Sequence, residues 1–210
     1  MPRLNVERPA ARPTNAGSRQ RYQNIIRVAR TLTIDHGEDA VQMQEVAKQA
    51  GVALNTLYRY FPSKSHLYTA ILEDELKTLD VRTNSTDEAF SLDDDEGAER
   101  VLDMISSASN SLLSRPNLAR AMINATMASQ ASSGIAVAQS DKLLESAVLK
   151  VLGIVDPVTT DHRMIYAIML SWTAALSAVL NDRLRRSESE EVLRLSITQL
   201  IKVRSNRAAS

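Results

Sequence analysis

Apolar residues recur along most of the chain at intervals of three and four positions, which is the period of an amphipathic α-helix. Strand-like alternation of apolar and polar residues is nearly absent, and glycine and proline fall between the apolar runs. The pattern therefore predicts an all-α protein. It places nine helices over about residues 18–36, 42–50, 54–60, 63–82, 97–114, 116–131, 135–153, 158–182 and 188–204.

The same pattern divides the chain into five parts. Residues 1–17 are rich in Pro, Arg and Asn, which predicts a disordered tail. Residues 18–64 carry three short helices, and residues 65–82 form one long helix that can connect two domains. A polar linker over residues 83–96 follows, and residues 97–204 carry the helices of a second domain.

Charge is unevenly distributed along the chain, although its formal net charge is zero. Residues 1–66 contain ten Lys/Arg and five Asp/Glu, whereas the other 144 residues contain fifteen and twenty. A basic first part joined to an acidic second part suits a protein in which only the first part meets phosphate. A random fluctuation of charge is the alternative explanation.

Several classes of protein are disfavoured by what the sequence lacks. It has no cysteine, which excludes disulfides, thiolate zinc sites and cysteine nucleophiles and fits a reducing cytoplasm. No uninterrupted apolar run reaches about 18 residues, so no membrane span is expected. The three histidines (36, 66 and 162) are scattered, and no Gly-rich phosphate loop, G-x-S-x-G or H-E-x-x-H motif is present. We therefore expect no enzyme activity, no cofactor and no membrane partner.

An acidic cluster, Asp93-Asp94-Asp95-Glu96, ends the predicted linker. Such a cluster could bind a divalent cation. The simpler interpretation is a solvated loop that leads into a helix, because the N-terminus of a helix favours acidic groups. No metal site is predicted.

The segment VAKQAGVALNTLYRYFPSK, residues 46–64, predicts a helix-turn-helix followed by the start of another helix. Ala47 is small where two helices must cross closely, and Gly51 stands where the backbone turns left-handed. Pro62 ends the second helix, and Ser63 can cap the next one. This geometry places the second helix of the pair in the major groove of DNA.

The segment resembles the DNA-binding domain of the TetR family of transcription regulators, through the series T-x-Y-x-Y-F-x-S-K that begins at Thr56 and ends at Lys64. The resemblance implies a nine-helix architecture, with a three-helix DNA-binding domain and a six-helix ligand-binding and dimerisation domain. AVQMQEVAKQAGVALNTLYRYFPSKSHL, RPNLARAM and the W-x-x-x-L pattern at Trp172 look like the steroid-catabolism repressors of that family, which respond to acyl-CoA thioesters of sterol intermediates.

The resemblance implies a repressor that binds a palindromic operator in double-stranded DNA and is released by a small apolar or acyl-CoA effector. Effector binding is expected to shift the helix over residues 65–82 and so change the separation of two recognition helices. Two alternatives remain. One is a regulator of an efflux, lipid or xenobiotic pathway, and the other is an architectural DNA-binding protein that needs no ligand.

The candidate DNA contacts combine the family positions with side-chain chemistry. A glutamine can pair with adenine in two hydrogen bonds, and Lys64 adds positive charge at a helix start that already favours phosphate. Tyr58 and Tyr60 point about 200° apart on a helix, so they cannot both lie in one small core. The candidates are Gln44, Asn55, Thr56, Tyr58, Arg59, Tyr60 and Lys64, with Arg19 and Arg21 at the start of the first helix.

The second domain mixes methionines with small polar residues, which favours an adaptable ligand pocket, because methionine fits irregular apolar shapes. Ordinary core packing is the alternative for each methionine. The candidate pocket residues are Met104, Met122, Asn124, Met127, Gln130, Tyr166, Met169 and Trp172.

Two copies of the helix-turn-helix, about 34 Å apart, are needed to read a palindrome, so we expect a homodimer. The last two predicted helices carry wide apolar stripes, and the resemblance also places a four-helix dimer interface there. The alternative is that these stripes close the core of the single chain. The candidate interface residues are Ile168, Leu176, Val179, Leu193, Ile197 and Leu200.

Overall fold

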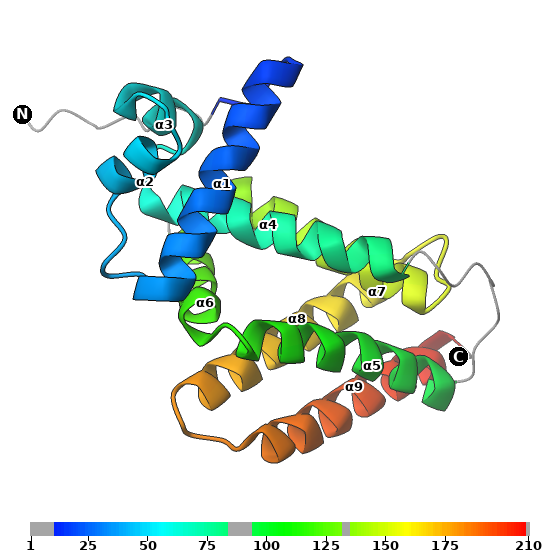
Figure 1. Ribbon diagram of the computed structural model, residues 1–210. Coiled ribbons are helices and arrows are strands. Elements are labelled where there is room, and N and C mark those ends of the chain that lie inside the picture. The colour runs from blue at the N-terminus through cyan, green and yellow to red at the C-terminus, as the bar shows by residue number, and fades with distance from the viewer. Residues whose placement is uncertain (1–10, 84–93, 132–134, 209–210) are drawn as a thin grey trace, which may run out of the picture. The chain divides into compact units, whose positions relative to one another are not determined.

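The computed structural model describes residues 11–83, 94–131 and 135–208, and the regular structure within these ranges is entirely helical (Figure 1). The predicted all-α class is confirmed, and each predicted helix ends within four residues of an observed one. The helices are α1 (Ala16–His36), α2 (Met43–Gln49), α3 (Leu54–Tyr60), α4 (Lys64–Thr83), α5 (Asp94–Leu113), α6 (Pro116–Ala131), α7 (Ile135–Val151), α8 (Thr159–Leu180) and α9 (Arg186–Ala208).

The turn between α2 and α3 depends on the residues that the sequence singled out. Gly51 has a φ of 66°, in the left-handed region that only glycine enters at little cost. Ser63 precedes α4, and its Oγ accepts a hydrogen bond from the His66 amide at 3.4 Å. Because this oxygen satisfies an amide in the first turn, the predicted cap at Ser63 is confirmed.

The start of α5 differs from the prediction. The helix was expected to begin at about Gly97, but α5 begins three residues earlier, at Asp94. A Cβ atom built on Gly97 would lie 3.2 Å from Cδ2 of Leu152, which follows α7. Gly97 therefore allows close packing of α5 against the end of α7, rather than interrupting a helix.

The helices form two compact units whose boundaries fall inside α4, at the start of α6 and near the start of α7. The first unit contains residues 1–72 and 117–137, and the second contains residues 73–116 and 138–210. The sequence-based division assigned α6 to the second domain, whereas the structure places it with α1 and the first half of α4. Two hydrogen bonds explain this: Asn117 Nδ2 donates to the Ile34 carbonyl at 3.1 Å, and Ser65 Oγ donates to the Ala125 carbonyl at 3.4 Å.

The core of the first unit contains one buried polar contact that joins α1 to α4. The hydroxyl groups of Thr33 and Tyr68 lie 3.1 Å apart, and both side chains are fully buried. Burial raises the pKa of Tyr68 to about 12. Because an unpaired hydroxyl in a core is costly, this hydrogen bond fixes the register between the two helices.

The second unit packs α9 against both α5 and α8 (Figure 1). Asp161, 1% exposed in the first turn of α8, accepts hydrogen bonds from the Val158 amide at 2.9 Å and from Arg204 Nε at 2.5 Å. Burial alone raises the pKa of Asp161, but the Val158 amide and the Arg204 guanidinium together lower the pKa below its ordinary value. This ion pair, between a buried carboxylate and a half-buried guanidinium, ties the beginning of α8 to the end of α9.

Candidate nucleic-acid interface and effector pocket

Helix α3 separates its residues into a buried side and an exposed side. Leu57 and Tyr60 are buried, whereas Asn55, Tyr58 and Arg59 are exposed. The three exposed side chains carry an amide, a phenol and a guanidinium, which suit contacts with base edges and phosphate groups. The structure thus brings three of the predicted contact residues together on one side of this helix.

The other predicted contacts vary in exposure. Gln44 on α2 is exposed, as are Arg19 and Arg21 in the first turns of α1. Thr56 on α3 is half-buried. All four lie in the first unit, so the helix-turn-helix and the start of α1 supply the candidate surface.

Tyr60 belongs to the core and is removed from the candidate contacts. It is 3% exposed, its ring meets Tyr22 edge-on at a centroid distance of 5.7 Å, and Phe61 lies 6.3 Å away. Tyr58, by contrast, is 40% exposed. The argument that two tyrosines on alternate positions cannot share one small core is therefore confirmed, and Tyr58 is the outward one.

Lys64 makes a contact inside the first unit that the sequence did not predict. Its Nζ donates to the Glu38 carbonyl at 2.5 Å, and Asn124 Nδ2 donates to Glu38 Oε2 at 3.1 Å. The contact ties the start of α4 to the segment after α1. Since an ammonium group has three N–H donors, this bond leaves Lys64 able to bind a phosphate group as well.

The structure adds a segment from the predicted tail to this surface. The Ala11 amide donates to the Arg59 carbonyl at 2.9 Å, so the chain before α1 lies beside the end of α3. Arg12, the next residue, is exposed. Nothing in the periodicity indicates this contact, because the tail has no apolar pattern. Residues 1–10 lie outside the described residues.

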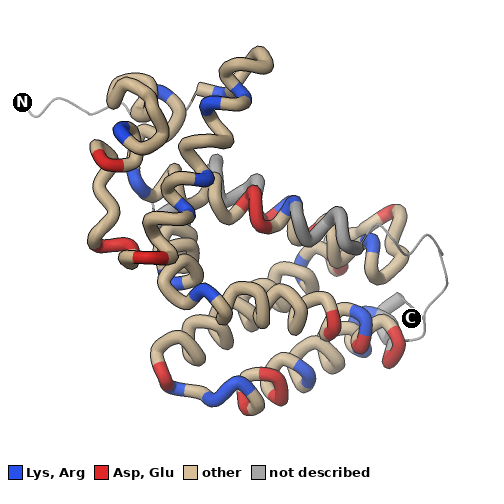
Figure 2. The backbone as a smooth tube through the Cα atoms, in the orientation of Figure 1, with Lys and Arg blue, Asp and Glu red and all other residues tan. Residues whose placement is uncertain are grey.

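Charge is segregated within the first unit. Figure 2 shows Lys and Arg near the start of α1 and around α2 and α3, and Asp and Glu mainly between α1 and α2, with Glu45 on α2 itself. The exposed basic residues near these helices are Arg12, Arg19, Arg21, Lys48 and Arg59. A concentration of positive charge beside the helix-turn-helix favours the polyanionic backbone of DNA.

A pocket in the second unit lies between α4, α5, α7 and α8, with about 280 Å³ of empty space that is partly open to solvent. Trp172, one of the residues that line this pocket, donates a hydrogen bond from Nε1 to Ser109 Oγ at 2.8 Å. The hydroxyl satisfies the indole N–H, so the ring can turn its apolar face to the pocket. The lining residues are Leu76, Met104, Ile105, Ala108, Leu143, Leu144, Ala147 and Trp172.

Two of the predicted pocket residues, Met104 and Trp172, line this pocket. Met122 and Asn124 do not, because α6 packs in the first unit, where Met122 is 2% exposed and Asn124 binds Glu38. The sequence could not separate these residues, since the apolar face of α6 has the same period as that of α5.

Met127, Tyr166 and Met169 do not line it either. Met127 and Tyr166 are each 52% exposed, and Met169 is half-buried. The side chain of Gln130 lies outside the described residues.

The predicted dimer residues are largely used by the chain itself. Ile168, Leu176, Leu193 and Ile197 are at most 5% exposed within the single chain. They close the core of the second unit, as the alternative interpretation proposed, and have little area left for a partner. Val179 and Leu200 are half-buried.

The outer sides of α8 and α9 carry exposed apolar residues that sequence analysis did not select for the dimer interface. The two residues on α8 are four positions apart, and the three on α9 follow one another at steps of three and eight. Each set therefore lies on one face of its helix. They are Tyr166 and Leu170 on α8, and Val192, Leu195 and Val203 on α9, with exposures between 45% and 66%.

The described part of the acidic cluster is occupied by ion pairs. Asp95 Oδ1 lies 2.9 Å from Lys202 Nζ, and Glu96 Oε1 lies 2.8 Å from Arg100 Nη2. Asp93 and the side chain of Asp94 lie outside the described residues. Among the described residues, no group of three or more His, Asp or Glu side chains could hold a metal ion.

Two family models match the chain over its two predicted functional parts. "Bacterial regulatory proteins, tetR family" matches residues 25–71, and "Tetracyclin repressor-like, C-terminal domain" matches residues 95–200. The chain belongs to the tetR family. The first match covers the helix-turn-helix, and the second covers α5 to α8 and most of α9.

Similar tetR-family proteins extend over most of the chain. The HTH-type transcriptional repressor KstR of Mycobacterium tuberculosis (strain ATCC 25618 / H37Rv) is 30% identical over 186 residues, which cover 87% of this chain and 81% of the relative. A TetR transcriptional regulator from Rhodococcus sp. RHA1 is 30% identical with a TM-score of 0.81, covering 88% of this chain and 97% of its own.

A more distant structure shares the fold alone. It is FadR of Thermus thermophilus, a TetR-family transcriptional repressor in complex with lauroyl-CoA. It is 15% identical, with a TM-score of 0.67, covering 86% of this chain and 93% of its own.

Proposed function

We propose that this tetR-family protein is a cytoplasmic, homodimeric transcriptional repressor that releases its DNA operator when an effector enters the second unit. The observation that carries the proposal is the exposed side of α3, where Asn55, Tyr58 and Arg59 stand within a basic surface. The name of the KstR relative supports repression. The FadR structure, which holds lauroyl-CoA, supports an acyl-CoA effector, and the resemblance of the sequence to steroid-catabolism repressors makes a sterol-derived acyl-CoA the candidate.

The DNA contacts divide into those that read bases and those that bind the backbone. Gln44 and Asn55 carry amides that can pair with adenine, so they are assigned to base edges. The Tyr58 hydroxyl and the guanidinium of Arg59 are assigned to phosphate groups. Lys64, at the start of α4, adds a cation where helix amides already favour an anion.

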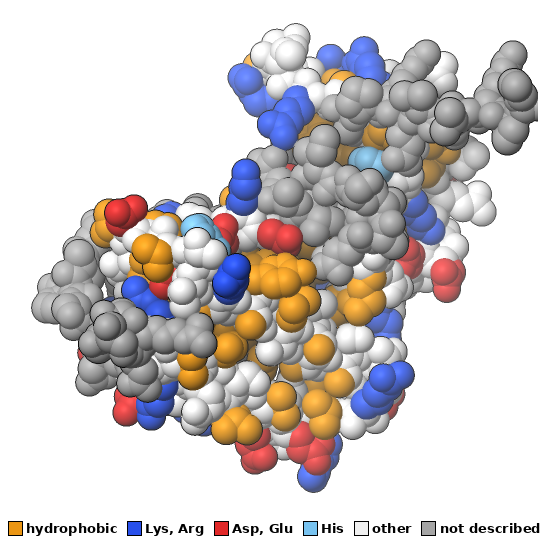
Figure 3. Space-filling model, turned by 180° about the vertical axis from the view of Figure 1, so that it is seen from behind, with side chains coloured by type: hydrophobic (Ala, Val, Ile, Leu, Met, Phe, Trp, Pro, Cys, Tyr) orange, Lys and Arg blue, Asp and Glu red, His pale blue; other side chains and the backbone are white. Residues whose placement is uncertain are grey.

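Dimerisation is assigned to the outer sides of α8 and α9. The most apolar 18-residue window of α8 has a mean hydropathy of 1.5, enough for a membrane span by composition, yet 39% of it is buried in the single chain. Packing of α8 on α9 explains the buried part, and a second copy would cover exposed residues such as Leu170 and Leu195. Figure 3 shows hydrophobic side chains gathered in the lower half of its view, with charged side chains mainly around them.

The effector site is assigned to the pocket beside Trp172. The enclosed space here is far smaller than the roughly 300–1,000 Å³ typical of small-molecule sites, because the 280 Å³ between the lining atoms includes open solvent. A sterol-sized body therefore requires side chains to move, and Met104 has the flexibility for this. The apolar lining selects an apolar body, and a charged group of the effector would have to remain outside it.

The test is a footprint on the DNA upstream of the gene for this chain, followed by titration with saturated and sterol-derived acyl-CoA esters. We expect protection of a palindrome, and a change in Trp172 fluorescence that parallels release of DNA. DNA binding that is indifferent to every ester would contradict effector control and favour an architectural protein. Failure to bind any duplex at low ionic strength would reject the function altogether.

The two tyrosines of α3 provide a matched pair of substitutions. Tyr58→Phe should weaken operator binding by about 1 kcal/mol, or roughly fivefold, because it removes one hydrogen bond to phosphate. Tyr60→Phe should leave the affinity unchanged, because the Tyr60 ring stays in its aromatic cluster. Fluorescence anisotropy with a labelled operator measures both. An equal loss in the two variants would contradict the assignment of Tyr58 to the DNA surface.

A further inference from the structure

One ion pair lies beside two of the places where the chain passes between the two units. The chain leaves the first unit after Leu72, in the middle of α4, and returns to it after Pro116, at the start of α6. Glu75 follows the first crossing by three residues, and Arg115 comes two residues before Asn117, where the first unit resumes. Glu75 and Arg115 themselves both belong to the second unit.

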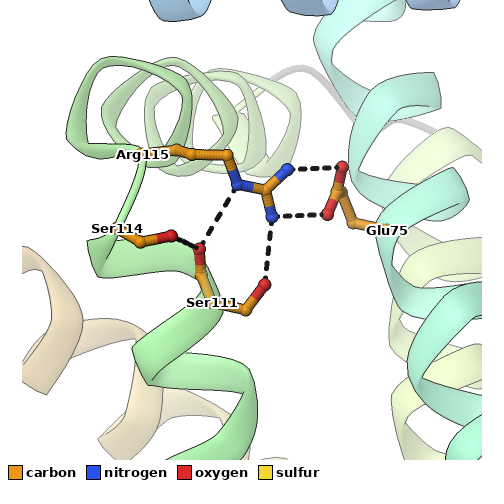
Figure 4. A network of polar contacts seen from close by, with 4 residues as sticks. All are labelled: Glu75, Ser111, Ser114 and Arg115. Atoms are coloured by element: carbon orange, nitrogen blue, oxygen red, sulfur yellow. Dashed lines mark hydrogen bonds and ion pairs between the residues drawn. The ribbon is translucent and has the colours of Figure 1, made fainter.

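Arg115 and Glu75 form a bidentate ion pair, with two parallel hydrogen bonds (Figure 4). Arg115 Nη1 donates to Glu75 Oε1 at 3.0 Å, and Nη2 donates to Oε2 at 2.8 Å. The other side of the guanidinium is held by Ser111, through its carbonyl at 3.3 Å and its Oγ at 3.1 Å. The side chains of Arg115 and Glu75 are 25% and 18% exposed. Such geometry fixes direction as well as distance, which a single surface charge pair does not.

Both chain segments that leave this contact are anchored to α1 within the first unit. The first half of α4 is joined to α1 by the Thr33–Tyr68 hydrogen bond. The start of α6 is joined to it by Asn117, which donates to the Ile34 carbonyl. The ion pair therefore restrains, from the second unit, the two segments that hold α1.

The same contact adjoins the pocket. Glu75 is the neighbour of Leu76, which lines it. On α5, the lining residues Met104 and Ala108 are followed by Ser111 at steps of four and three, which place these three residues on one helix face. Arg115 lies two residues beyond the end of α5 and is held by Ser111. An effector that spreads α4 from α5 would strain the ion pair directly.

We infer that the Glu75–Arg115 ion pair is a positioning element that fixes how α4 and the start of α6 leave the second unit, and thereby sets the spacing of the two DNA-binding surfaces in the dimer. The inference rests on the proposed function. Without the pair, each DNA-binding surface samples more orientations, and only a fraction of dimers matches both half-sites. The apparent dissociation constant rises in inverse proportion to that fraction.

The test compares Glu75→Gln, Arg115→Met and the double variant on the footprinted operator and on versions with two base pairs added between the half-sites. Each single variant should bind the natural operator about tenfold more weakly, within the roughly 5–150-fold range of such couplings. The double variant should be no weaker than the weaker single variant, because both remove the same contact. Wild-type protein should lose more affinity from the added base pairs than any variant does.

Glu99→Gln and Arg194→Gln are the control substitutions. They break an ion pair between α5 and α9 that lies in the same unit but far in sequence from either crossing. They should leave operator affinity within about twofold, since exposed pairs contribute little. Thermal unfolding reports whether each variant is folded. If Arg115→Met does not fold, Arg115→Lys replaces it, and its affinity should lie between wild type and Glu75→Gln, because lysine cannot form the bidentate contact.

Two results would overturn the inference while leaving the proposed function intact. One is operator affinity of the folded Glu75 and Arg115 variants equal to wild type. The other is a spacing penalty as large in the variants as in wild type, which would show that the pair only adds stability. Wild-type protein that binds no operator would instead reject the proposed function.

Discussion

Replacing Leu195 with Glu should convert the dimer into monomers and weaken operator binding more than a hundredfold. Leu195 is 66% exposed on the outer side of α9, where the proposed interface needs an apolar side chain. Burying a carboxylate there without a partner is costly enough to separate the two copies. A monomer engages one half-site at a time and loses the gain from linked binding, which is on the order of 10²–10⁴.

Analytical ultracentrifugation and fluorescence anisotropy measure the two effects on the same protein. Val155→Glu is the matched control, because Val155 is 92% exposed in the connection between α7 and α8. It introduces the same charge at an exposed apolar residue away from both helix faces and should remain dimeric. A Leu195→Glu variant that stays dimeric with full affinity would place the interface elsewhere on the chain.

Asp161→Asn should destabilise the second unit by about 2 kcal/mol at neutral pH, because it removes a buried carboxylate charge from its hydrogen bonds with Arg204 and the Val158 amide. Asp161 is 1% exposed and is bound by the Val158 amide and by Arg204. The substitution keeps the size of the side chain but removes its charge. Thermal or urea unfolding, followed by the loss of helical circular dichroism, measures the change in the free energy of unfolding.

The difference between wild type and Asp161→Asn should also depend on pH. Because the folded-state pKa of Asp161 is lowered, its contribution is present above the unfolded pKa of about 3.9 and is lost as pH falls through the folded value. The difference should therefore be constant from about pH 5 to 8 and shrink towards pH 3. The same change at exposed Asp103 on α5 is the control and should be nearly neutral. A difference that persists undiminished at low pH would contradict the role of the carboxylate charge.

The sequence predicted helices well because their ends carry local chemical signals. Gly51 needs left-handed backbone, and Ser63 supplies an oxygen to a helix amide, so both residues act within one turn of their own position. Periodicity also showed that Tyr58 and Tyr60 face opposite ways. It did not show which of the two enters the core, because that depends on Tyr22, which lies on another helix.

The hydrophobic periodicity could not predict contacts between segments that are far apart in the sequence. The Asp161–Arg204 and Glu75–Arg115 pairs join residues about 40 positions apart, and charged residues at such separations are too common for any spacing to single them out. The dimer prediction chose the most apolar stripe residues, such as Ile168 and Ile197. Those are the residues that a chain buries first in its own core, so the outer faces must be found from exposure.

The placement of α6 has a practical consequence for hybrid regulators. A recombinant in which everything after Leu72 comes from a relative would bring in a foreign α6 against the resident α1. The Asn117–Ile34 and Ser65–Ala125 hydrogen bonds would then be formed between mismatched parents. To transfer the effector specificity of a relative, residues 73–116 and 138–210 should be exchanged and the native residues 117–137 retained, so that the DNA-binding unit stays intact.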